Sequence, residues 1–231
     1  MKPFKQFILE FPMLLDFPKE EGPHQGVGFL KKPISGLVHS PMGVFSILKP
    51  NKIGTVVVGS GEKYTIHHAV HTERDVFMGS KKRIHHIFLA DNNSTVVGYI
   101  KGIGIRSDKN REKIADVEHI GLDSSVLLPA HRGKGLYGSM LKTFIKKRQH
   151  VVYSGNVQSE GSMKAWKELA KNQEADGLEI RVHPDASPNR YTIGLPWNKE
   201  LPHDIWVGAK TDSGRTIKPE NILLSARNKV D

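Results

Sequence analysis

The sequence predicts an α/β (α+β) fold, in which a mixed, mostly antiparallel twisted sheet is flanked by helices. β-Branched runs separated by turn residues recur between residues 54 and 128. A turn with three glycines follows them, and an amphipathic helix begins directly after this turn. Further strand and helix patterns come next, and this order favours helices packed on a mixed sheet. The 231 residues can bury one sizeable core.

Two hairpins and a further strand are expected before the glycine turn. The hairpin turns are predicted at residues 59–62 and 91–94, which are rich in glycine, serine, asparagine and aspartate. Their strands are predicted at Thr55–Val58, Tyr64–Ile66, Arg83–Leu89 and Thr95–Ile100. Residues 106–116 are polar and predict a loop. Val117–Leu128 predicts the strand that leads into the glycine turn.

The helix after the glycine turn gives the clearest periodic pattern in the chain and is predicted from Tyr137 to about Lys147. Its apolar residues share one face at helical spacing. They are Tyr137, Met140, Leu141, Phe144 and Ile145. Lysine and arginine residues lie off this face, and those in the last turn favour the helix C-terminus. This face is therefore expected to pack on the sheet.

The elements after this helix are a short strand, a second helix and a final pair of strands. The short strand is predicted at His150–Tyr153. Ser159 or Ser162 is expected to cap the second helix, because a serine hydroxyl accepts hydrogen bonds from the free N–H groups there. The final strands are predicted at Ile180–His183 and Arg190–Ile193.

The chain is basic, and its charge is concentrated in one region. The formal net charge is +10, and residues 80–150 contain 14 lysine and arginine residues against 6 acidic residues. A concentrated positive field attracts polyanions, so a nucleic acid, a phosphorylated cofactor or an acidic protein is an expected partner. The plain alternative is a solvated basic face that only keeps the protein soluble.

The absence of cysteine excludes disulfides, a thiol nucleophile and cysteine metal sites. The first residues lack the apolar core and the cleavage site of a signal peptide. No apolar run approaches the roughly 18 residues that a membrane span requires. We therefore expect a cytoplasmic protein that does not enter a membrane.

The glycine turn combines Gly133, Gly135 and Gly138 with Arg132 and Lys134 at a predicted helix N-terminus, where backbone N–H groups and the helix dipole attract phosphates. A nucleotide P-loop is excluded, because the Gly-Lys pair is followed by glycine and the required earlier glycine is missing. The dinucleotide pattern G-x-G-x-x-G matches by spacing. However, the acidic residue expected about 20 positions later is absent.

A third interpretation fits more of the chain. The pattern Leu-x-Pro-x-x-Arg-Gly-x-Gly at residues 127–135 resembles motif A of the GNAT superfamily of N-acetyltransferases. In that family a strand ends in this loop, and the loop binds the pyrophosphate of acetyl-CoA at a helix N-terminus. The resemblance covers roughly residues 83–194, with hairpin, strand, loop and helix in the family's order. Tyr137 stands where the family usually has a small residue, and residues 158–169 look like those of divergent GNAT-like proteins from phages and mobile elements.

The resemblance implies three segments along the chain. Residues 1–53 are expected to form an N-terminal wrap or extension, in which prolines recur too often for long regular elements. Residues 54–195 are expected to form a GNAT-like acyl-CoA-binding domain. Residues 196–231 are expected to be a C-terminal extension that packs on this domain or trails from it.

The resemblance also implies a cofactor site at the loop. Its expected residues are Leu127, Leu128, Arg132, Gly133, Lys134, Gly135, Leu136, Tyr137 and Gly138. The glycines would let the backbone approach the phosphates and present N–H donors. Arg132 and Lys134 would add positive charge beside them.

The expected chemistry is acetyl transfer to an amine, which needs a base for the ammonium proton and an acid for the leaving thiolate. Enzymes of the family often place the base on the strand before the loop, where Glu118 and His119 lie. Adjacent strand residues face opposite sides, so only one of these two can face the cleft. Tyr153 is the first candidate for the acid, and Tyr191 is the second.

Histidines are frequent, and the densest set is His67, His68, His71, His85 and His86. No H-E-x-x-H pattern accompanies them, and the sequence predicts no metal site. These side chains are expected to line the acceptor side of the cleft or to pair across the hairpin. The resulting function is an acyl-CoA-dependent N-acyltransferase that uses acetyl-CoA or another acyl-CoA. The alternative is an inactive or repurposed GNAT-fold module that binds nucleic acid or an acidic protein through its basic face.

Overall fold

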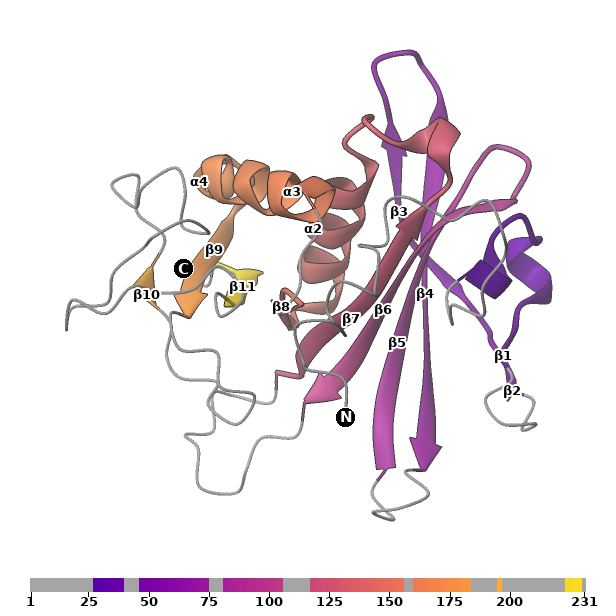
Figure 1. The fold of residues 1–231 in the computed structure, drawn as a ribbon, viewed down its shortest axis with the longest axis horizontal. Helices are drawn as coiled ribbons and strands as arrows, with labels where there is room; N and C mark the ends of the chain where they lie inside the picture. The colour runs from indigo at the N-terminus through magenta and orange to yellow at the C-terminus, as the bar shows by residue number, and fades with distance from the viewer. Residues whose placement is uncertain are drawn as a thin grey trace, which may run out of the picture.

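The computed structural model describes residues 27–39, 46–74, 81–105, 117–155, 160–183, 195–196 and 223–229. Within this part of the chain, nine strands form a large sheet and two form a small ribbon (Figure 1). The sheet strands are β3 Asn51–Val57, β4 Lys63–Arg74, β5 Lys81–Ala90, β6 Val96–Ile105, β7 His119–Leu127, β8 Val151–Tyr153, β9 Leu178–His183, β10 Leu195–Pro196 and β11 Leu223–Asn228. The ribbon strands are β1 Val38–His39 and β2 Ser46–Ile47.

The described helices are three α-helices and three 3₁₀ turns. They are α2 Leu136–Arg148, α3 Glu160–Lys171, α4 Gln173–Asp176, η1 Val27–Phe29, η2 Ile34–Gly36 and η4 Pro129–His131. None of them is long and apolar enough to cross a membrane. The clearest helix of the sequence is confirmed as α2, and the strand before the glycine turn is confirmed as β7.

The strand order of the sheet is β10-β9-β11-β8-β7-β6-β5-β4-β3. Every neighbouring pair is antiparallel except β7 and β8, which are parallel. The predicted mixed and mostly antiparallel sheet is therefore confirmed. A doubly wound parallel sheet, which the dinucleotide pattern would require, is excluded for the described strands.

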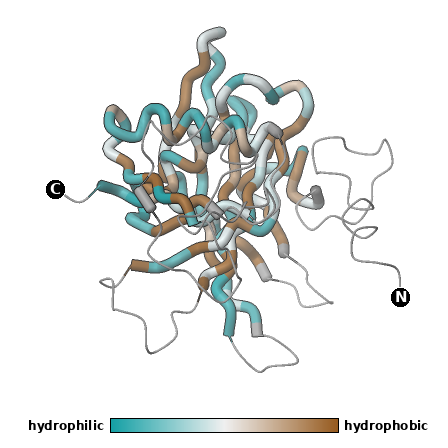
Figure 2. The backbone as a smooth tube through the Cα atoms, turned by 60° about the vertical axis from the view of Figure 1, so that its left-hand side comes forward, coloured by the Kyte–Doolittle hydropathy of each residue, from teal (hydrophilic) through white to brown (hydrophobic). Residues whose placement is uncertain are grey.

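The sheet has a long half and a short half. Figure 1 shows the long strands β3–β7 on the right and the shorter strands β8–β11 on the left, with α2 and α3 near the junction. The main core lies between the sheet and these two helices, and it includes Met140, Phe144, Trp166 and Leu224. In Figure 2 much of the hydrophobic colour lies in the middle of the molecule, and hydrophilic colours mark the outer turns of the helices and the pair of strand ends at the bottom of the view.

The opposite face of the long strands carries a smaller core. Phe29 and Leu37, from the segment around η1 and η2, pack there on Phe88 and Tyr99. The Phe29 and Phe88 rings meet edge to face, with their centroids 5.4 Å apart. Since aromatic pairs of this geometry add to the stability gained by burial, this segment is packed against the sheet rather than loosely attached.

Some predicted elements differ from the structure. Ser162 lies inside α3, so it is not the N-cap of that helix, and Ser159 lies outside the described residues. The expected loop at 106–116 and the expected strand Arg190–Ile193 also lie outside them. The strand partners of β9 are β11 and β10 instead. Residues 223–228, in the predicted C-terminal segment, form β11, which lies between β8 and β9 and pairs with both of them.

Candidate functional site

The site is organised around the point where β7 and β8 separate. β7 pairs with β6 along its whole length, but it pairs with β8 only from His119 to Gly121. The last parallel pair joins Gly121 to Tyr153. From Leu122 to Leu127, the second edge of β7 therefore has no strand partner among the described residues. Its backbone N–H and C=O groups on that edge are available to an extended ligand.

Two local features hold the strands apart. The pairing of β6 and β7 shifts by one residue at Asp123, which makes a β-bulge, and Asp123 forms an ion pair of 3.1 Å with Lys101. A bulge bends its strand and increases the local twist. On the other side, Ser154 is bound to β11 through two hydrogen bonds with Leu224, of 2.7 and 2.9 Å. β8 therefore follows β11 away from β7.

A cavity of about 570 Å³ lies beside this open edge. Its walls come from the end of β7, the glycine turn, the first turns of α2 and one face of α3. The lining includes Ser125, Leu127, Arg132, Ser162, Lys164 and Ala165. The volume suits a small organic ligand or cofactor.

The glycine turn forms one end of this cavity. Gly133 and Gly135 have φ values of +75° and +70°, a conformation that favours glycine. A Cβ at Gly133, Gly135 or Gly138 would meet no neighbouring atom within 4 Å, so the space in front of the turn is open. Gly135 is the N-cap of α2, with no side-chain cap and no acidic residue in the first turn. Within the described part of the helix, no carboxylate of its own first turn competes for these N–H groups, so they suit an anion.

The turn is fixed by contacts to distant strands. The Tyr64 hydroxyl lies 2.9 Å from Glu62 Oε2 and 2.9 Å from His131 Nδ1. Lys134 Nζ donates to Glu62 Oε2 at 2.6 Å; this hydrogen bond lowers the pKa of Glu62 and raises the pKa of Lys134. Arg132 Nε donates to the carbonyl oxygen of Leu127 at 3.1 Å. The β3–β4 hairpin therefore holds the glycine turn in place through Glu62 and Tyr64.

The structure brings together most of the residues expected at a cofactor. Seven of the nine line the cavity: Leu127, Arg132, Gly133, Gly135, Leu136, Tyr137 and Gly138. Lys134 and Leu128 are not among its lining residues. The Lys134 ammonium is paired with Glu62, and Leu128 packs against the main core while its N–H donates to Val97.

Tyr137 does not block the turn. Its side chain packs against the main core, and its hydroxyl lies 3.5 Å from Ser162 Oγ on α3. Burial raises the pKa of the Tyr137 hydroxyl, while hydrogen bonds that include Ser162 and Ser125 act in the opposite direction. The ring therefore forms part of the wall between α2 and α3, and the Cβ position of Gly138 remains open beside the turn.

The candidate bases Glu118 and His119 lie on opposite faces of the sheet, as neighbours on a strand must. Glu118 lies on the face of α2, where its carboxylate oxygens contact His85 Nε2 at 3.0 Å and Arg83 at 3.0 Å. His119 lies on the other face, and its Nδ1 is 2.9 Å from the Tyr153 hydroxyl. The structure thus joins His119 to Tyr153 and separates Glu118 from both. Tyr191 lies outside the described residues.

The His119–Tyr153 pair sits where the two strands begin to separate. Tyr153 is buried, and its ring stacks on the imidazole of His119 with their centroids 5.7 Å apart. Burial lowers the pKa of His119, and the nearby positive charge of Arg227 lowers it further. The imidazole is therefore neutral near pH 7 and can accept a proton.

Four of the five histidines of the dense set pair with one another across β4 and β5, and His67 bonds to Thr65 instead. His68 Nε2 lies 3.1 Å from His85 Nδ1 on the face of α2. His71 Nδ1 lies 2.7 Å from His86 Nε2 on the opposite face, and His86 continues to the Tyr99 hydroxyl at 2.8 Å. Burial lowers the pKa of His68 to about 3. Of the two roles expected for these histidines, the structure therefore contains the pairing between β4 and β5.

Several lining residues were missed by the sequence interpretation. Ser125 follows the bulge on β7, and Ser162 and Lys164 come from α3. The polar run Asp123-Ser124-Ser125 inside an otherwise apolar strand was the one available signal, because a bulge turns polar residues toward an unpaired edge. Nothing in the local sequence of α3 indicates which of its faces meets the cavity.

Comparison with known proteins gives structural neighbours only. No protein-family model matches the chain, and no curated protein matches it. One similar solved structure contains a GCN5-related glucosamine N-acetyltransferase region in a fungal multi-domain GH3 β-N-acetylglucosaminidase, with 17% identity over 43% of this chain and 13% of that chain, at a TM-score of 0.27. A second is described as an acetyltransferase of the GNAT family from Bacteroides thetaiotaomicron, with 10% identity over 64% of this chain and 63% of that chain, at a TM-score of 0.30.

Both neighbours are GNAT proteins. The chain spans less than two thirds of the length of either one. The mixed, mostly antiparallel sheet follows from the strand order of this chain, and its site follows from the separation of β7 from β8 and from the glycine turn before α2.

Proposed function

We propose that the protein is an acyl-CoA-dependent N-acyltransferase, which transfers an acetyl group from acetyl-CoA to an amine. One observation carries this proposal: the unpaired edge of β7 runs beside a cavity that ends on the uncapped N-terminus of α2. The pantetheine arm of CoA is extended and contains amides, so it can bind a strand edge as an additional strand would. Its pyrophosphate is an anion that suits a helix N-terminus.

The residues at each end of the cavity fit this ligand. The backbone N–H groups from Gly133 to Leu136 would hold the pyrophosphate, and the glycine side of the turn leaves room for it. The backbone of Ser125–Leu127 would pair with the pantetheine amides. Lys164 is exposed at the rim and would add positive charge near the phosphates of the nucleotide end.

His119 and Tyr153 would carry out the proton transfers of the reaction. Neutral His119 takes one proton from the ammonium group of the acceptor. The free amine then attacks the acyl carbon, a C–N bond forms, and the carbonyl becomes an oxyanion. A backbone N–H at the start of the open edge, near Leu122 and next to the Gly121–Tyr153 pair, would stabilise that charge.

Collapse of this intermediate breaks the C–S bond and leaves a CoA thiolate. Tyr153 protonates the thiolate and regains a proton from the His119 imidazolium across their 2.9 Å hydrogen bond. The acceptor nitrogen loses its second proton to solvent as the amide forms. The balance is one ammonium ion and one thioester converted into one amide, one thiol and one released proton.

Isothermal titration of the full chain with acetyl-CoA tests the binding half of this proposal. Gly135→Ala adds a side chain at φ +70° in front of the turn and should weaken binding by at least about tenfold, or about 1.4 kcal/mol. Gly177→Ala is the control, because Gly177 also has a positive φ of +62° with open space around it, and it does not line the cavity. No binding to the unaltered protein at millimolar acetyl-CoA, or equal binding to Gly135→Ala, contradicts the proposal.

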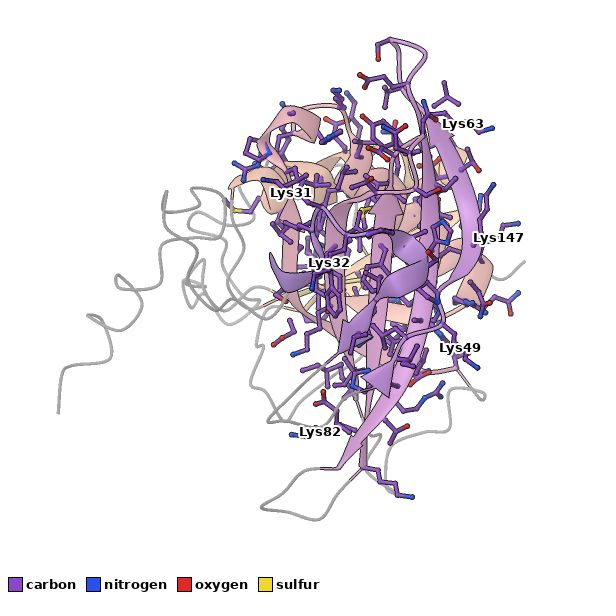
Figure 3. All side chains as sticks on the ribbon, turned by 90° about the vertical axis from the view of Figure 1, so that its right-hand side faces the viewer. Lys31, Lys32, Lys49, Lys63, Lys82 and Lys147 are labelled. Carbon is purple, nitrogen blue, oxygen red and sulfur yellow. The ribbon has the colours of Figure 1, made fainter. Side chains whose placement is uncertain are left out.

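A second candidate function is supported by a specific surface. Figure 3 looks at the side of the molecule that carries β3 and the η1–η2 segment, and six lysines are labelled across it. They are Lys31, Lys32, Lys49, Lys63, Lys82 and Lys147, and all six are exposed. A broad field of exposed lysines suits the phosphate backbone of a nucleic acid.

Filter binding of DNA and RNA over a salt series tests this second candidate. Phosphate contacts give an affinity that falls steeply with salt, with a slope close to the number of phosphates neutralised. Replacing Lys31, Lys49 and Lys63 together with glutamine should reduce that slope by about three. Affinity that does not change with salt contradicts a nucleic-acid role for this face.

A further inference from the structure

A cluster of metal-ligand side chains, from β5 and from the residues just before β7 and β8, lies away from the cavity beside the glycine turn. His85 Nε2 is 3.0 Å from Glu118 Oε1, and His150 Nε2 is 3.9 Å from Glu118 Oε2. The three ligand atoms all lie within 4.8 Å of one another. None of these residues lines the cavity, whose nearest residue on the same strand, Ser125, is seven positions from Glu118, or roughly 20 Å along an extended chain.

We propose that His85, Glu118 and His150 bind one divalent transition-metal ion of the zinc type. Two imidazoles and one carboxylate form a donor set that suits Zn²⁺, and three protein ligands leave a fourth position open. Ligand atoms at about 2.0–2.2 Å from a tetrahedral ion lie roughly 3.3–3.6 Å apart, so the observed separations need only small side-chain shifts. The side chains of Glu118 and His150 are each 17% exposed, which leaves an entry path.

The neighbouring residues hold the imidazoles in place. Phe144, in the last turns of α2, packs against the rings of His68, His85 and His150, with centroids 4.9, 6.1 and 5.5 Å away. His68 Nε2 lies 3.1 Å from His85 Nδ1, and the two rings are stacked 10° from parallel. When an ion binds, His85 would donate Nδ1–H to His68, and the lone pair of its Nε2 would then face the ion. His68 is therefore a positioning residue for the metal ligand.

Arg83 competes with a metal ion for the carboxylate of Glu118. Its guanidinium contacts Glu118 Oε2 at 3.0 Å, and its side chain is 56% exposed. In the metal-free protein this cation balances the carboxylate. Because the arginine side chain can move into solvent, a divalent ion can replace it as the counter-charge of Glu118. The proposal thus predicts opposite effects for replacing Glu118 and for replacing its arginine partner.

The test is titration of the untagged full chain with Zn²⁺, after dialysis against a chelator, with Co²⁺ absorption in the visible range as a second readout. One ion per chain should bind. Glu118→Gln and His150→Ala should each weaken binding by about tenfold or more, and His68→Ala by about 10–100-fold. Arg83→Gln should bind more tightly than the unaltered protein.

His67→Ala is the matched control, because His67 bonds to Thr65 and contacts none of the three ligands. It should bind Zn²⁺ as the unaltered protein does. Circular dichroism and thermal melting establish that each variant is folded, and His150→Ala keeps the test decisive if His85→Ala does not fold. The proposal is overturned if no ion binds at submillimolar Zn²⁺, or if folded Glu118→Gln and His150→Ala bind as tightly as the unaltered protein.

Discussion

The hydroxyl of Tyr153 lies 2.9 Å from Nδ1 of His119, and Tyr153 is the last residue of β8 that pairs with β7. This contact joins a side chain that can accept a proton to one that can donate a proton, across two parallel strands. The sequence separation of 34 residues hides it from any local pattern. The hydrogen bond gives the proposed transferase a direct path for returning a proton to the acid.

Tyr153→Phe removes the proposed acid and should lower kcat by about 10²–10⁴-fold, with little change in the Kd for acetyl-CoA. Release of the CoA thiol in the presence of a panel of amines measures kcat. Tyr99→Phe is the matched control, because it also removes a buried tyrosine hydroxyl bound to a histidine, His86, at 2.8 Å. Equal turnover by Tyr153→Phe and the unaltered protein would remove Tyr153 from the mechanism.

Tyr64→Phe should weaken acetyl-CoA binding, although Tyr64 does not line the cavity. The hydroxyl that links Glu62 to His131 is lost, so the turn before α2 loses support from the β3–β4 hairpin. We expect a decrease of about 1–2 kcal/mol in the free energy of unfolding and a several-fold increase in Kd. Urea unfolding and isothermal titration measure the two effects. A destabilised variant with an unchanged Kd would show that the hairpin does not position the turn.

Gly54→Ala should destabilise the protein by about 1–3 kcal/mol, because α2 approaches β3 closely at this residue. A Cβ at Gly54 would lie 2.5 Å from Cγ2 of Thr143. Adding Thr143→Ser removes that methyl group and should restore most of the stability. Gly59→Ala, which has open space around it, is the control. If the double variant is as unstable as Gly54→Ala alone, the contact with Thr143 is not the cause.

The ion pairs of Glu179 with Arg181 and Arg227 should make the stability of the protein depend on pH in the acidic range. Burial by itself would raise its pKa, but hydrogen bonds from Arg227 and Arg181 outweigh burial and lower it below 4.5. Stability from a carboxylate with a lowered pKa is present above the unfolded-state pKa and is lost as pH falls through the folded-state value. Glu179→Gln should therefore melt below the unaltered protein at neutral pH, and the difference should shrink below about pH 4.

The control for this pH profile is Glu174→Gln. Glu174 is 78% exposed and pairs with Lys229, which is also exposed, so its contribution should be small at every pH. Thermal melts from neutral pH down to about pH 3 compare the three proteins. A constant difference between Glu179→Gln and the unaltered protein across this range would contradict the assignment.

Local patterns predicted the parts of the fold that local physics determines. The apolar stripe of α2 is buried as expected at Met140, Leu141, Phe144 and Ile145. The turn between β5 and β6 forms because Asp91 Oδ1 accepts hydrogen bonds from the N–H groups of Asn93 and Thr95. Each of these interactions joins residues close in sequence, so periodicity and turn chemistry are enough to indicate them.

Long-range pairing was not predictable in the same way. Ser225 pairs with Tyr153 and with Arg181, which lie 72 and 44 positions away, and no local signal selects those partners. The glycine turn could be found because its cations and glycines are contiguous. The cluster of His85, Glu118 and His150 could not, since three separate segments supply one ligand each.

Because β11 lies between β8 and β9, this half of the sheet can be completed only after residues 223–228 have been synthesised. During synthesis the ribosome releases β7, the glycine turn and α2 well before residues 223–228. Until those residues arrive, β8 and β9 each lack the neighbour that they share, and Ser154 lacks the anchor that draws its strand aside. A nascent chain at that stage exposes two bare strand edges, which are prone to pairing with other chains. The cavity can therefore mature only after residues 223–228 have been synthesised, which nascent chains of different lengths should reveal.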